Sequence, residues 1–339
     1  MILHEEENEK LFSEAIRLTA EEFDVPQSYV EKDYYLTKAL LNISRYENSQ
    51  HIVFKGGTSL SKVYKAIYRF SEDIDLAVLP EDDWSPARIT RVMKKAFEYG
   101  EKDLTDSGIK FSNGSKFRKK RYYFPRVNKK EELGEVKDTI LIECNAFTTP
   151  SPIEVRKIRT LIAEWAIRKE NKGFIEQFLL QDFTFSVLCW KRTFCEKLLG
   201  LMASATRNDL SDKVRHFYDV TILCRNKEIY DFLNSNEFYQ MMELSVENDI
   251  RHAGNREQPW IVADLSLNQP FINFIECWEI VSEAYDGDFQ KMVTRPDKSP
   301  VFDEIFKVFS LIKDRLSEYS KQKCHIDCLQ LQKDLKPDN

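Results

Sequence analysis

The stretch that decides the fold is Phe54-Lys55-Gly56-Gly57-Thr58-Ser59-Leu60, and it is followed by Ser71-Glu72-Asp73-Ile74-Asp75-Leu76. The first run places a glycine turn after an apolar strand, and the second places two carboxylates at i and i+2 on another strand. Because side chains alternate along a strand, Asp73 and Asp75 share one face of it. Neighbouring carboxylates repel each other unless a cation lies between them. The pattern therefore predicts a site for a triphosphate.

Phosphoryl and nucleotidyl transfer require a divalent metal, main-chain donors for the phosphates and in-line placement of the attacking oxygen. Asp73 and Asp75 offer the carboxylate oxygens that Mg²⁺ (or Mn²⁺) prefers. Gly56 and Gly57 let the main chain approach a phosphate closely at the start of a helix. Hydroxyl donors are available close by; they are Thr58, Ser59 and Ser71.

The order of these parts is more informative than any one of them. A pair of acids or a pair of glycines occurs often, whereas strand, Gly-Gly turn, helix, strand and Asp-x-Asp in this order are typical of a polymerase-β-like nucleotidyltransferase. The Walker A pattern GxxxxGK[ST] and the kinase glycine-rich loop are both absent here, which argues against an ordinary ATPase. A kinase-like phosphotransferase and a catalytically silent binding module of the same fold remain alternatives.

The composition is that of a mixed-charge globular protein. The chain has 339 residues, of which 42% are hydrophobic and 31% charged, and its net charge is −6. We expect two domains and no global basic signature for nucleic acid. A local exception is the stretch 110–130, which contains no acid and nine cations: Lys110, Lys116, Arg118, Lys119, Lys120, Arg121, Arg126, Lys129 and Lys130. With its interleaved aromatics this stretch suits an RNA acceptor; a solvated hairpin is the alternative.

No stretch of about 18 apolar residues occurs, so we expect no membrane span. The acidic N-terminus has no apolar signal core, and seven scattered cysteines do not form a disulfide framework, so we expect reduced thiols and a cytoplasmic location. Cys324 and Cys328 lack a second ligand pair for structural zinc.

Hydrophobic periodicity divides the chain near residues 150–165. We expect an α/β nucleotidyltransferase core with N-terminal helices over 1–160, a helical C-terminal domain over 161–325 and a flexible tail over 326–339. The expected helices are 5–23, 30–41, a helix from the glycine turn to Ile67, 86–105, 190–204 and 211–225. The expected strands are 52–55, 73–79, two or three within 109–149, and a candidate at 183–188.

Glu143 lies within the apolar strand 139–145. Burial of an unpaired carboxylate costs several kcal/mol, so Glu143 requires a partner. A metal shared with Asp73 and Asp75 is one solution, and an ion pair with Lys or Arg or a solvent-facing edge strand is another.

A second group of charges stands far along the chain. Lys197 follows Glu196, and Arg215 and Asp219 stand at i and i+4 on one helix face. From the residues alone, an exposed helix ion pair is the preferred interpretation, and His216 is expected to be a packing or surface residue. Within Glu31-Lys32-Asp33-Tyr34, the charges of Lys32 and Asp33 are expected on an exposed helix face, and contact with a ligand is the alternative.

Taken together, the motifs at 54–60, 69–76, 196–198 and 215–219, with Glu31-Lys32-Asp33-Tyr34, resemble the AbiEii/AbiGii-type nucleotidyltransferases. That family includes toxins of type IV toxin–antitoxin and abortive-infection systems and the related MenT toxins. The resemblance covers about residues 25–225.

The resemblance implies Mg²⁺-dependent transfer of a nucleoside monophosphate from an NTP to an acceptor. In MenT-like members the acceptor is tRNA, and in AbiEii-like members GTP is the associated nucleotide. It also implies a cognate antitoxin as partner. It makes Asp73 and Asp75 metal ligands and places Ser71 at the nucleotide. It also implies that Lys197 and Asp219 complete the site from the helical domain, and that Glu143 is a looser third acid.

Overall fold

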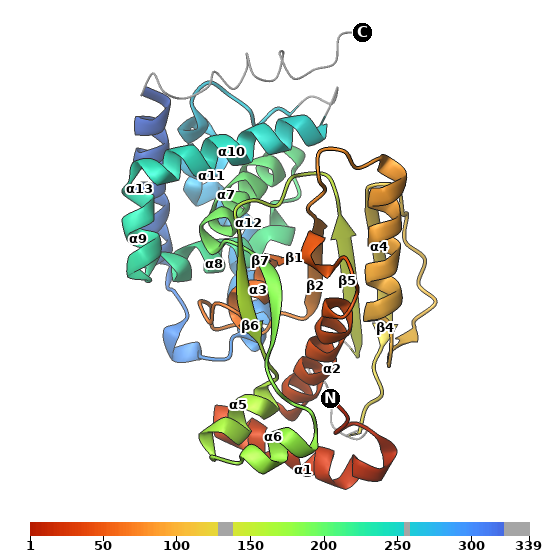
Figure 1. Ribbon diagram of the computed structural model, residues 1–339. Coiled ribbons are helices and arrows are strands. Elements are labelled where there is room, and N and C mark those ends of the chain that lie inside the picture. The colour runs from red at the N-terminus through yellow and green to blue at the C-terminus, as the bar shows by residue number, and fades with distance from the viewer. Residues whose placement is uncertain (128–137, 254–257, 322–339) are drawn as a thin grey trace. The chain divides into compact units, whose positions relative to one another are not determined.

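The computed structural model describes residues 1–127, 138–253 and 258–321 (Figure 1). The chain forms two compact units. Met1–Tyr64 and Phe70–Leu188 make the first, and Lys65–Arg69 with Cys189–Asn339 make the second. This division differs from the boundary expected near residue 160, because residues 161–188 add two helices and a sheet strand to the first unit.

The first unit contains a seven-stranded mixed sheet in the order β3-β4-β5-β2-β1-β7-β6. β1 pairs with β2 antiparallel and with β7 parallel, while β2 pairs with β5 parallel. The strands are β1 Ile52–Lys55, β2 Asp73–Val78, β3 Thr105–Asp106, β4 Phe117–Tyr123, β5 Thr139–Asn145, β6 Ile153–Ile158 and β7 Phe183–Leu188. The candidate strand at 183–188 is confirmed. Strand β6, which pairs with β7, was not among the expected strands.

One face of the sheet carries the core. Ile74 and Leu76 of β2 and Ile142 of β5 are fully buried, while the residues between them are only half-buried. This alternation is the period of two that strand geometry imposes. Helices α2 and α4 contact the sheet strands, and a Cβ atom at Gly100 of α4 would touch both Ile43 of α2 and Ile142. The buried face therefore lies beneath α2 and α4 (Figure 1).

Three helices of the first unit, α4, α5 and α6, begin at a side-chain cap. Pro86 occupies the first turn of α4, and the Ser85 hydroxyl accepts a bond from the Arg88 N–H at 3.3 Å. Thr160 caps α5 in the same way. The helix from the glycine turn ends at Lys62, earlier than expected, because the chain then enters the second unit at Lys65. The helices are α1 Glu9–Phe23, α2 Gln27–Ser44, α3 Gly56–Lys62, α4 Pro86–Gly100, α5 Leu161–Arg168 and α6 Lys172–Gln177.

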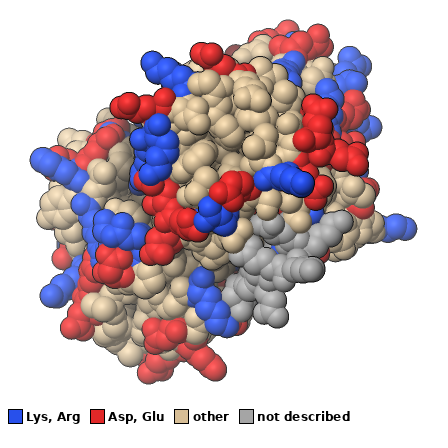
Figure 2. All heavy atoms as spheres, turned by 90° about the horizontal axis from the view of Figure 1, so that it is seen from below, with Lys and Arg blue, Asp and Glu red and all other residues tan. Residues whose placement is uncertain are grey.

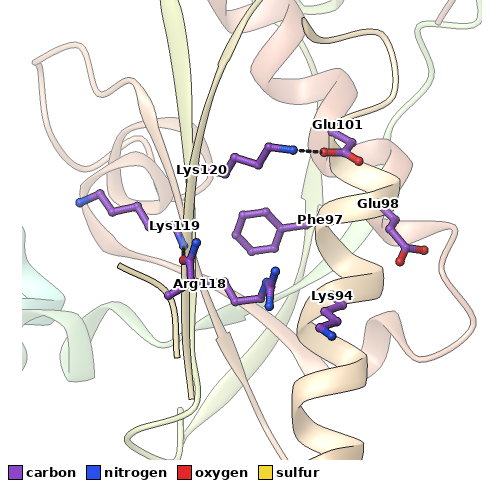
Figure 3. A pocket seen from close by; sticks show the side chains of 8 residues that line it. Lys94, Phe97, Glu98, Glu101, Arg118, Lys119 and Lys120 are labelled. Atoms are coloured by element: carbon purple, nitrogen blue, oxygen red, sulfur yellow. Dashed lines mark hydrogen bonds and ion pairs between the residues drawn. The ribbon is translucent and has the colours of Figure 1, made fainter. Parts of the chain in front are cut away.

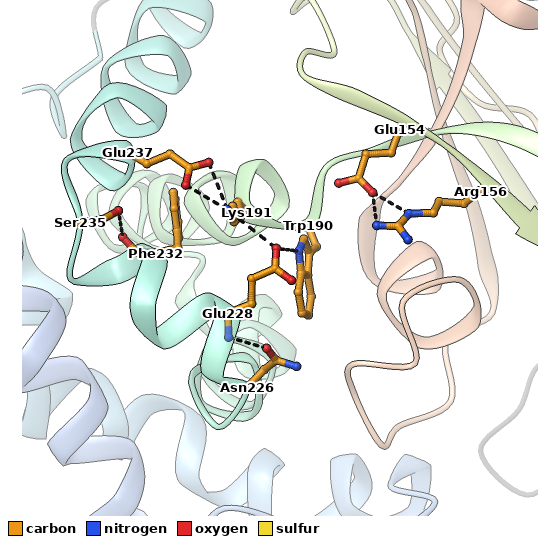
Figure 4. Close-up of polar contacts among 9 residues, drawn as sticks. All are labelled: Glu154, Arg156, Trp190, Lys191, Asn226, Glu228, Phe232, Ser235 and Glu237. Carbon is orange, nitrogen blue, oxygen red and sulfur yellow. Dashed lines mark hydrogen bonds and ion pairs between the residues drawn. The ribbon is translucent and has the colours of Figure 1, made fainter.

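The second unit is helical, as expected, and packs around aromatic rings. Phe217 of α8 stacks on Phe309 of α13 with ring centroids 5.1 Å apart. The start of α7 is tied down by Lys191, which bonds Glu237 of α10 at 2.9 Å, and by Trp190, which donates to Glu228 of α9 (Figure 4). The helices are α7 Trp190–Arg207, α8 Val214–Cys224, α9 Lys227–Leu233, α10 Asn236–Ala253, α11 Gln269–Ile272, α12 Phe274–Ala284 and α13 Phe302–Lys321.

Two sequence expectations concern the whole chain. Among the described residues, no helix combines the length and apolar character needed to cross a membrane. The five described cysteines are buried and free; they are Cys144, Cys189, Cys195, Cys224 and Cys277. Cys324, Cys328 and the tail expected over 326–339 lie outside the described residues.

Candidate active site

The glycine turn lies directly against one of the paired carboxylates. Gly56 adopts φ +78°, a left-handed conformation that favours glycine. A Cβ atom at this position would overlap Oδ2 of Asp75 and lie 3.0 Å from its Cγ. The β1–β2 register explains the approach, because Lys55, the residue before Gly56, pairs with Asp75. Only a residue without a side chain allows the turn and this carboxylate to meet.

The hydroxyl groups around the turn bond to each other and to the main chain. Thr58 Oγ1 lies 2.8 Å from Ser71 Oγ, which connects α3 to the segment that leads into β2. Ser59 is fully buried and donates to the Gly56 carbonyl at 2.8 Å. Thr58 is buried as well. These hydroxyl contacts fix the turn, while Gly56 and Gly57 themselves are half-buried.

Asp73 and Asp75 lie on the face of β2 opposite the apolar core. Both are half-buried, whereas Ile74 between them is fully buried. In the parallel pairing with β5, Asp73 stands beside Leu141 and Asp75 beside Glu143. Directly paired residues project from the same face of a sheet. The structure thus brings the expected acids and the glycine turn together on one face.

Glu143 makes an ion pair within the sheet. Its Oε2 lies 3.1 Å from Nζ of Lys119, the residue paired with it on β4. The two side chains are 27% and 29% exposed, so neither is deeply buried. Across the described residues, no group of three or more His, Cys, Asp or Glu side chains is placed to hold a metal. For Glu143, the structure favours the ion-pair alternative.

Side chains of helix α2 contact both α3, which begins at the glycine turn, and the segment that leads into β2. Lys32 is fully buried and its Nζ lies 2.6 Å from Oε2 of Glu72, the residue just before Asp73. Tyr29 stacks on Phe70, with centroids 4.0 Å apart and an interplanar angle of 20°. The expectation that the charge of Lys32 is exposed is wrong, because the side chain reaches through the core to the start of β2.

Asp33, the next residue of α2, makes an ion pair with α3. Asp33 Oδ1 lies 2.5 Å from Nζ of Lys62, at the end of α3, and Asp33 Oδ2 accepts a bond from the Leu161 N–H at 2.8 Å. Sequence reasoning missed both contacts. The signal available to it was two charged residues within a largely apolar helix, whose partners are far away in the sequence.

In the second unit, Asp219 is the centre of a buried ion cluster. The Arg69 guanidinium donates to it in a bidentate pair, with Nε 2.7 Å from Oδ1 and Nη2 2.8 Å from Oδ2. Lys197 Nζ lies 2.8 Å from Oδ2. Asp219 is fully buried, so the interpretation as an exposed pair with Arg215 is wrong. Lys197 and Asp219 do lie together, as the resemblance implies.

Sequence analysis assigned no role to Arg69. It lies in the short segment Lys65–Arg69 that leaves the sheet unit after α3 and returns just before β2. The segment is fixed within the second unit, since Arg69 forms a β-bridge with Val293 and the Thr294 N–H donates to the Tyr68 carbonyl at 2.8 Å. Arg69 therefore ties the chain just before the Asp-x-Asp strand to the same carboxylate that holds Lys197.

The cluster determines the charge of Asp219. Burial by itself would raise its pKa, but Arg69 and Lys197 together hold that pKa well below its ordinary value. Desolvation and the nearby Lys197 lower the pKa of His216 well below 6.5, so its imidazole is neutral at physiological pH. The ring packs against Gly200, which agrees with the expectation of a packing residue.

The middle of the basic stretch 110–130 forms strand β4, and its cations have mixed-charge surroundings. Lys119 and Lys120 of β4 both pair with acids, and Lys120 Nζ lies 2.9 Å from Oε2 of Glu101 (Figure 3). Figure 2 shows lysines, arginines and acids interspersed on the face drawn there. Lys129 and Lys130 lie outside the described residues. The cations of this stretch therefore differ in their ion-pair partners.

Comparison with known proteins identifies the family of the chain and a similar fold. The family model "Nucleotidyl transferase AbiEii toxin, Type IV TA system" matches residues 38–308. Among solved structures, the nucleotidyltransferase toxin MenT4 of Mycobacterium tuberculosis is similar in fold, with a TM-score of 0.52, 14% identity and coverage of 95% of this chain and 99% of that one. No curated protein matched. Since the family model spans most of the chain, this protein belongs to the AbiEii nucleotidyltransferase toxins of type IV toxin–antitoxin systems.

Proposed function

We propose that this toxin transfers a nucleoside monophosphate from an NTP to a terminal hydroxyl of an RNA acceptor of the tRNA class. The acceptor oxygen attacks the α-phosphorus, the bond to the β-phosphate oxygen breaks, and pyrophosphate leaves while the hydroxyl proton passes to water. The observation that carries the proposal is the contact of the Gly56 main chain with the Asp75 carboxylate, on the sheet face that also carries Asp73.

The donor set suits a divalent cation. Asp73 and Asp75 share one face and stay half-buried, so they would hold Mg²⁺ or Mn²⁺ with phosphate oxygens and water completing the shell. When bound, the metal neutralises charge on the triphosphate. The main chain at Gly56 and Gly57 binds phosphate oxygens, and the Thr58–Ser71 hydroxyl pair keeps the turn and the Asp-x-Asp strand in register.

In the helical unit, we assign Lys197 to charge neutralisation and Asp219 to the positioning of Lys197. Their 2.8 Å contact supports the second role, since an ammonium that is almost fully buried keeps one orientation when its counter-ion is fixed by Arg69. A Lys197→Gln variant should lower turnover, whereas a Lys197→Arg variant restores part of it.

A basic, aromatic strand supports the RNA acceptor. β4 belongs to the same sheet as β2, and its run Phe117–Tyr123 combines four cations with aromatic rings. Cationic side chains with stacking platforms are typical of single-stranded nucleic-acid sites.

The decisive experiment incubates the protein with total tRNA and each NTP in turn, labelled at either the α- or the γ-phosphate. Transfer of α-label that requires divalent cation, and its loss in Asp73→Ala, is the expected result. Transfer of γ-label instead would identify a phosphotransferase. Absence of both labels, together with no metal-dependent thermal shift by any NTP, would identify a non-enzymatic module.

A further inference from the structure

We infer that the acceptor RNA strand binds on one face of β4 only, the face that presents Lys119 and Arg121, while Arg118 and Lys120 serve the packing of α4 behind the sheet. This inference rests on the proposed function and narrows it, because it selects among the cations of the basic stretch.

Strand register places this face beside the paired acids. β4 pairs with β5 along its whole length, and β5 pairs with β2. One row across the three strands reads Arg121, Leu141 and Asp73. The next row reads Lys119, Glu143 and Asp75. Since paired residues share a face, Arg121 and Lys119 lie on the face that carries the acids, two strand spacings or about 10 Å away.

The even-numbered residues point to the opposite face. Lys120 bonds Glu101 at 2.9 Å and Asp106 at 3.1 Å, and the Tyr122 hydroxyl also donates to Glu101. Figure 3 shows Lys120 extending toward Glu101 of the α4 side, while Lys119 extends from the other side of the strand. Arg118 lines a cavity of about 190 Å³ with Phe97 of α4, and Lys119 and Lys120 also contribute to its lining. On this side Lys120 is neutralised by acids and Arg118 lines the cavity, whereas the ion pair of Lys119 is with Glu143 on the opposite face.

The odd-numbered face is equipped for a nucleotide strand. Lys119 and Arg121 lie 5.7 Å and 5.8 Å from the centroid of the Phe111 ring. Nε of Arg121 is buried and makes no hydrogen bond within the described part of the chain. Phe117 stacks on Phe147, and Tyr123 is 43% exposed at the end of the strand. Two cations beside aromatic rings complement phosphates and bases, which selects a ribonucleic-acid strand as the occupant.

Arg118 and Arg121 provide a matched test, since they share the strand and the residue type but lie on opposite faces. Binding of a fluorescent single-stranded oligoribonucleotide is measured by anisotropy over a series of salt concentrations. Arg121→Gln should weaken binding about tenfold and lower the slope of log K against log salt by about one, as expected for one lost phosphate contact. Arg118→Gln should change neither quantity, and the KM for NTP should stay constant in both variants.

Equal effects of the two substitutions, no effect of Arg121→Gln, or an increase in its KM for NTP would overturn the inference. Thermal unfolding of both variants shows whether either has lost its fold, and Arg121→Lys, which keeps the charge, should recover most of the affinity. Because RNA binding is measured without turnover, its result tests the RNA-binding face of β4 independently of the proposed nucleotidyl transfer. A wild-type protein that binds RNA through Arg121 but transfers no α-label would overturn the proposed function alone.

Discussion

The two units treat carboxylates in opposite ways. Asp73 and Asp75 are half-buried on the face of β2 opposite the apolar core, beside a glycine turn, whereas Asp219 is fully buried between Arg69 and Lys197. Mg²⁺ prefers carboxylate and phosphate oxygens, and the half-buried acids fit the metal-binding role that we propose for them. The environment of Asp219 supplies the counter-charges from the protein itself. We therefore propose a ligand-binding role for the two acids of the first unit and a positioning role for Asp219 in the second.

The largest effect should come from Asp75→Asn. Turnover of α-labelled NTP should fall by at least about 10³-fold, because loss of a metal ligand removes several kcal/mol of transition-state stabilisation. The free energy of unfolding should change by less than about 1 kcal/mol, since the residue is half-buried on the sheet surface. Denaturant unfolding and a transfer assay on the same preparation check both. A large loss of stability would show that Asp75, like Asp219, stabilises the fold.

Asp219→Asn should show the reverse balance. The substitution leaves Arg69 and Lys197 buried without their shared counter-charge, and it should lower the unfolding free energy by about 3–5 kcal/mol. Asp231→Asn removes an exposed i, i+4 partner of Lys227 and should cost no more than about 0.5 kcal/mol. Urea unfolding of the two variants measures the contrast, and similar values would contradict it.

The same carboxylate predicts a pH dependence. Burial opposes ionisation, but Arg69 and Lys197 keep the pKa of Asp219 below its unfolded value of 3.8. A depressed folded pKa contributes stability above the unfolded pKa and loses it as the pH falls toward the folded one. The stability difference between wild type and Asp219→Asn should therefore shrink as the pH is lowered from about 5 to about 2. A difference that stays constant over this range would show that the charge of Asp219 is not the cause.

Lys32→Met tests whether α2 positions the first unit's acids. Glu72 loses its 2.6 Å contact in the core, and the unfolding free energy should fall by about 3 kcal/mol. In the double variant Lys32→Met with Glu72→Leu, stability should return to near the wild-type value, because apolar packing often replaces a buried pair at no cost. Transfer activity should stay low in the double variant if the pair positions Asp73, and full activity would assign it to stability alone.

Gly56→Ala should have a modest effect on folding and a specific effect on activity. Gly56 and Gly108 both have left-handed φ values, +78° and +74°, so alanine should cost either site about 1–2 kcal/mol. Only the Cβ at position 56 would collide with Asp75, since nothing lies within 4 Å at position 108. Transfer activity should therefore fall in Gly56→Ala and stay unchanged in Gly108→Ala. Equal activities of the two variants would show that the contact between the turn and the Asp75 carboxylate does not contribute to catalysis.

Local patterns in the sequence predicted the sheet core and its two motifs. The strand 52–55 and the start of the next strand at Asp73 agree with β1 and β2, because alternation and glycine turns are properties of neighbouring residues. The strand β6 was missed because its middle residues are exposed and charged, and pairing with β7 rather than hydrophobic patterning makes it a strand. The unit boundary was missed for a related reason, since β7 joins the sheet by pairing with β1.

The sequence by itself determined that Asp73 and Asp75 share a face and that a glycine turn precedes them, since both follow from backbone geometry over a few residues. Only the tertiary structure decided which charges meet. Arg69 and Asp219 are 150 positions apart, and Lys32 and Glu72 are 40 apart. Such pairs carry no local signal, because the low-dielectric interior that requires a partner for each charge exists only once the chain has folded.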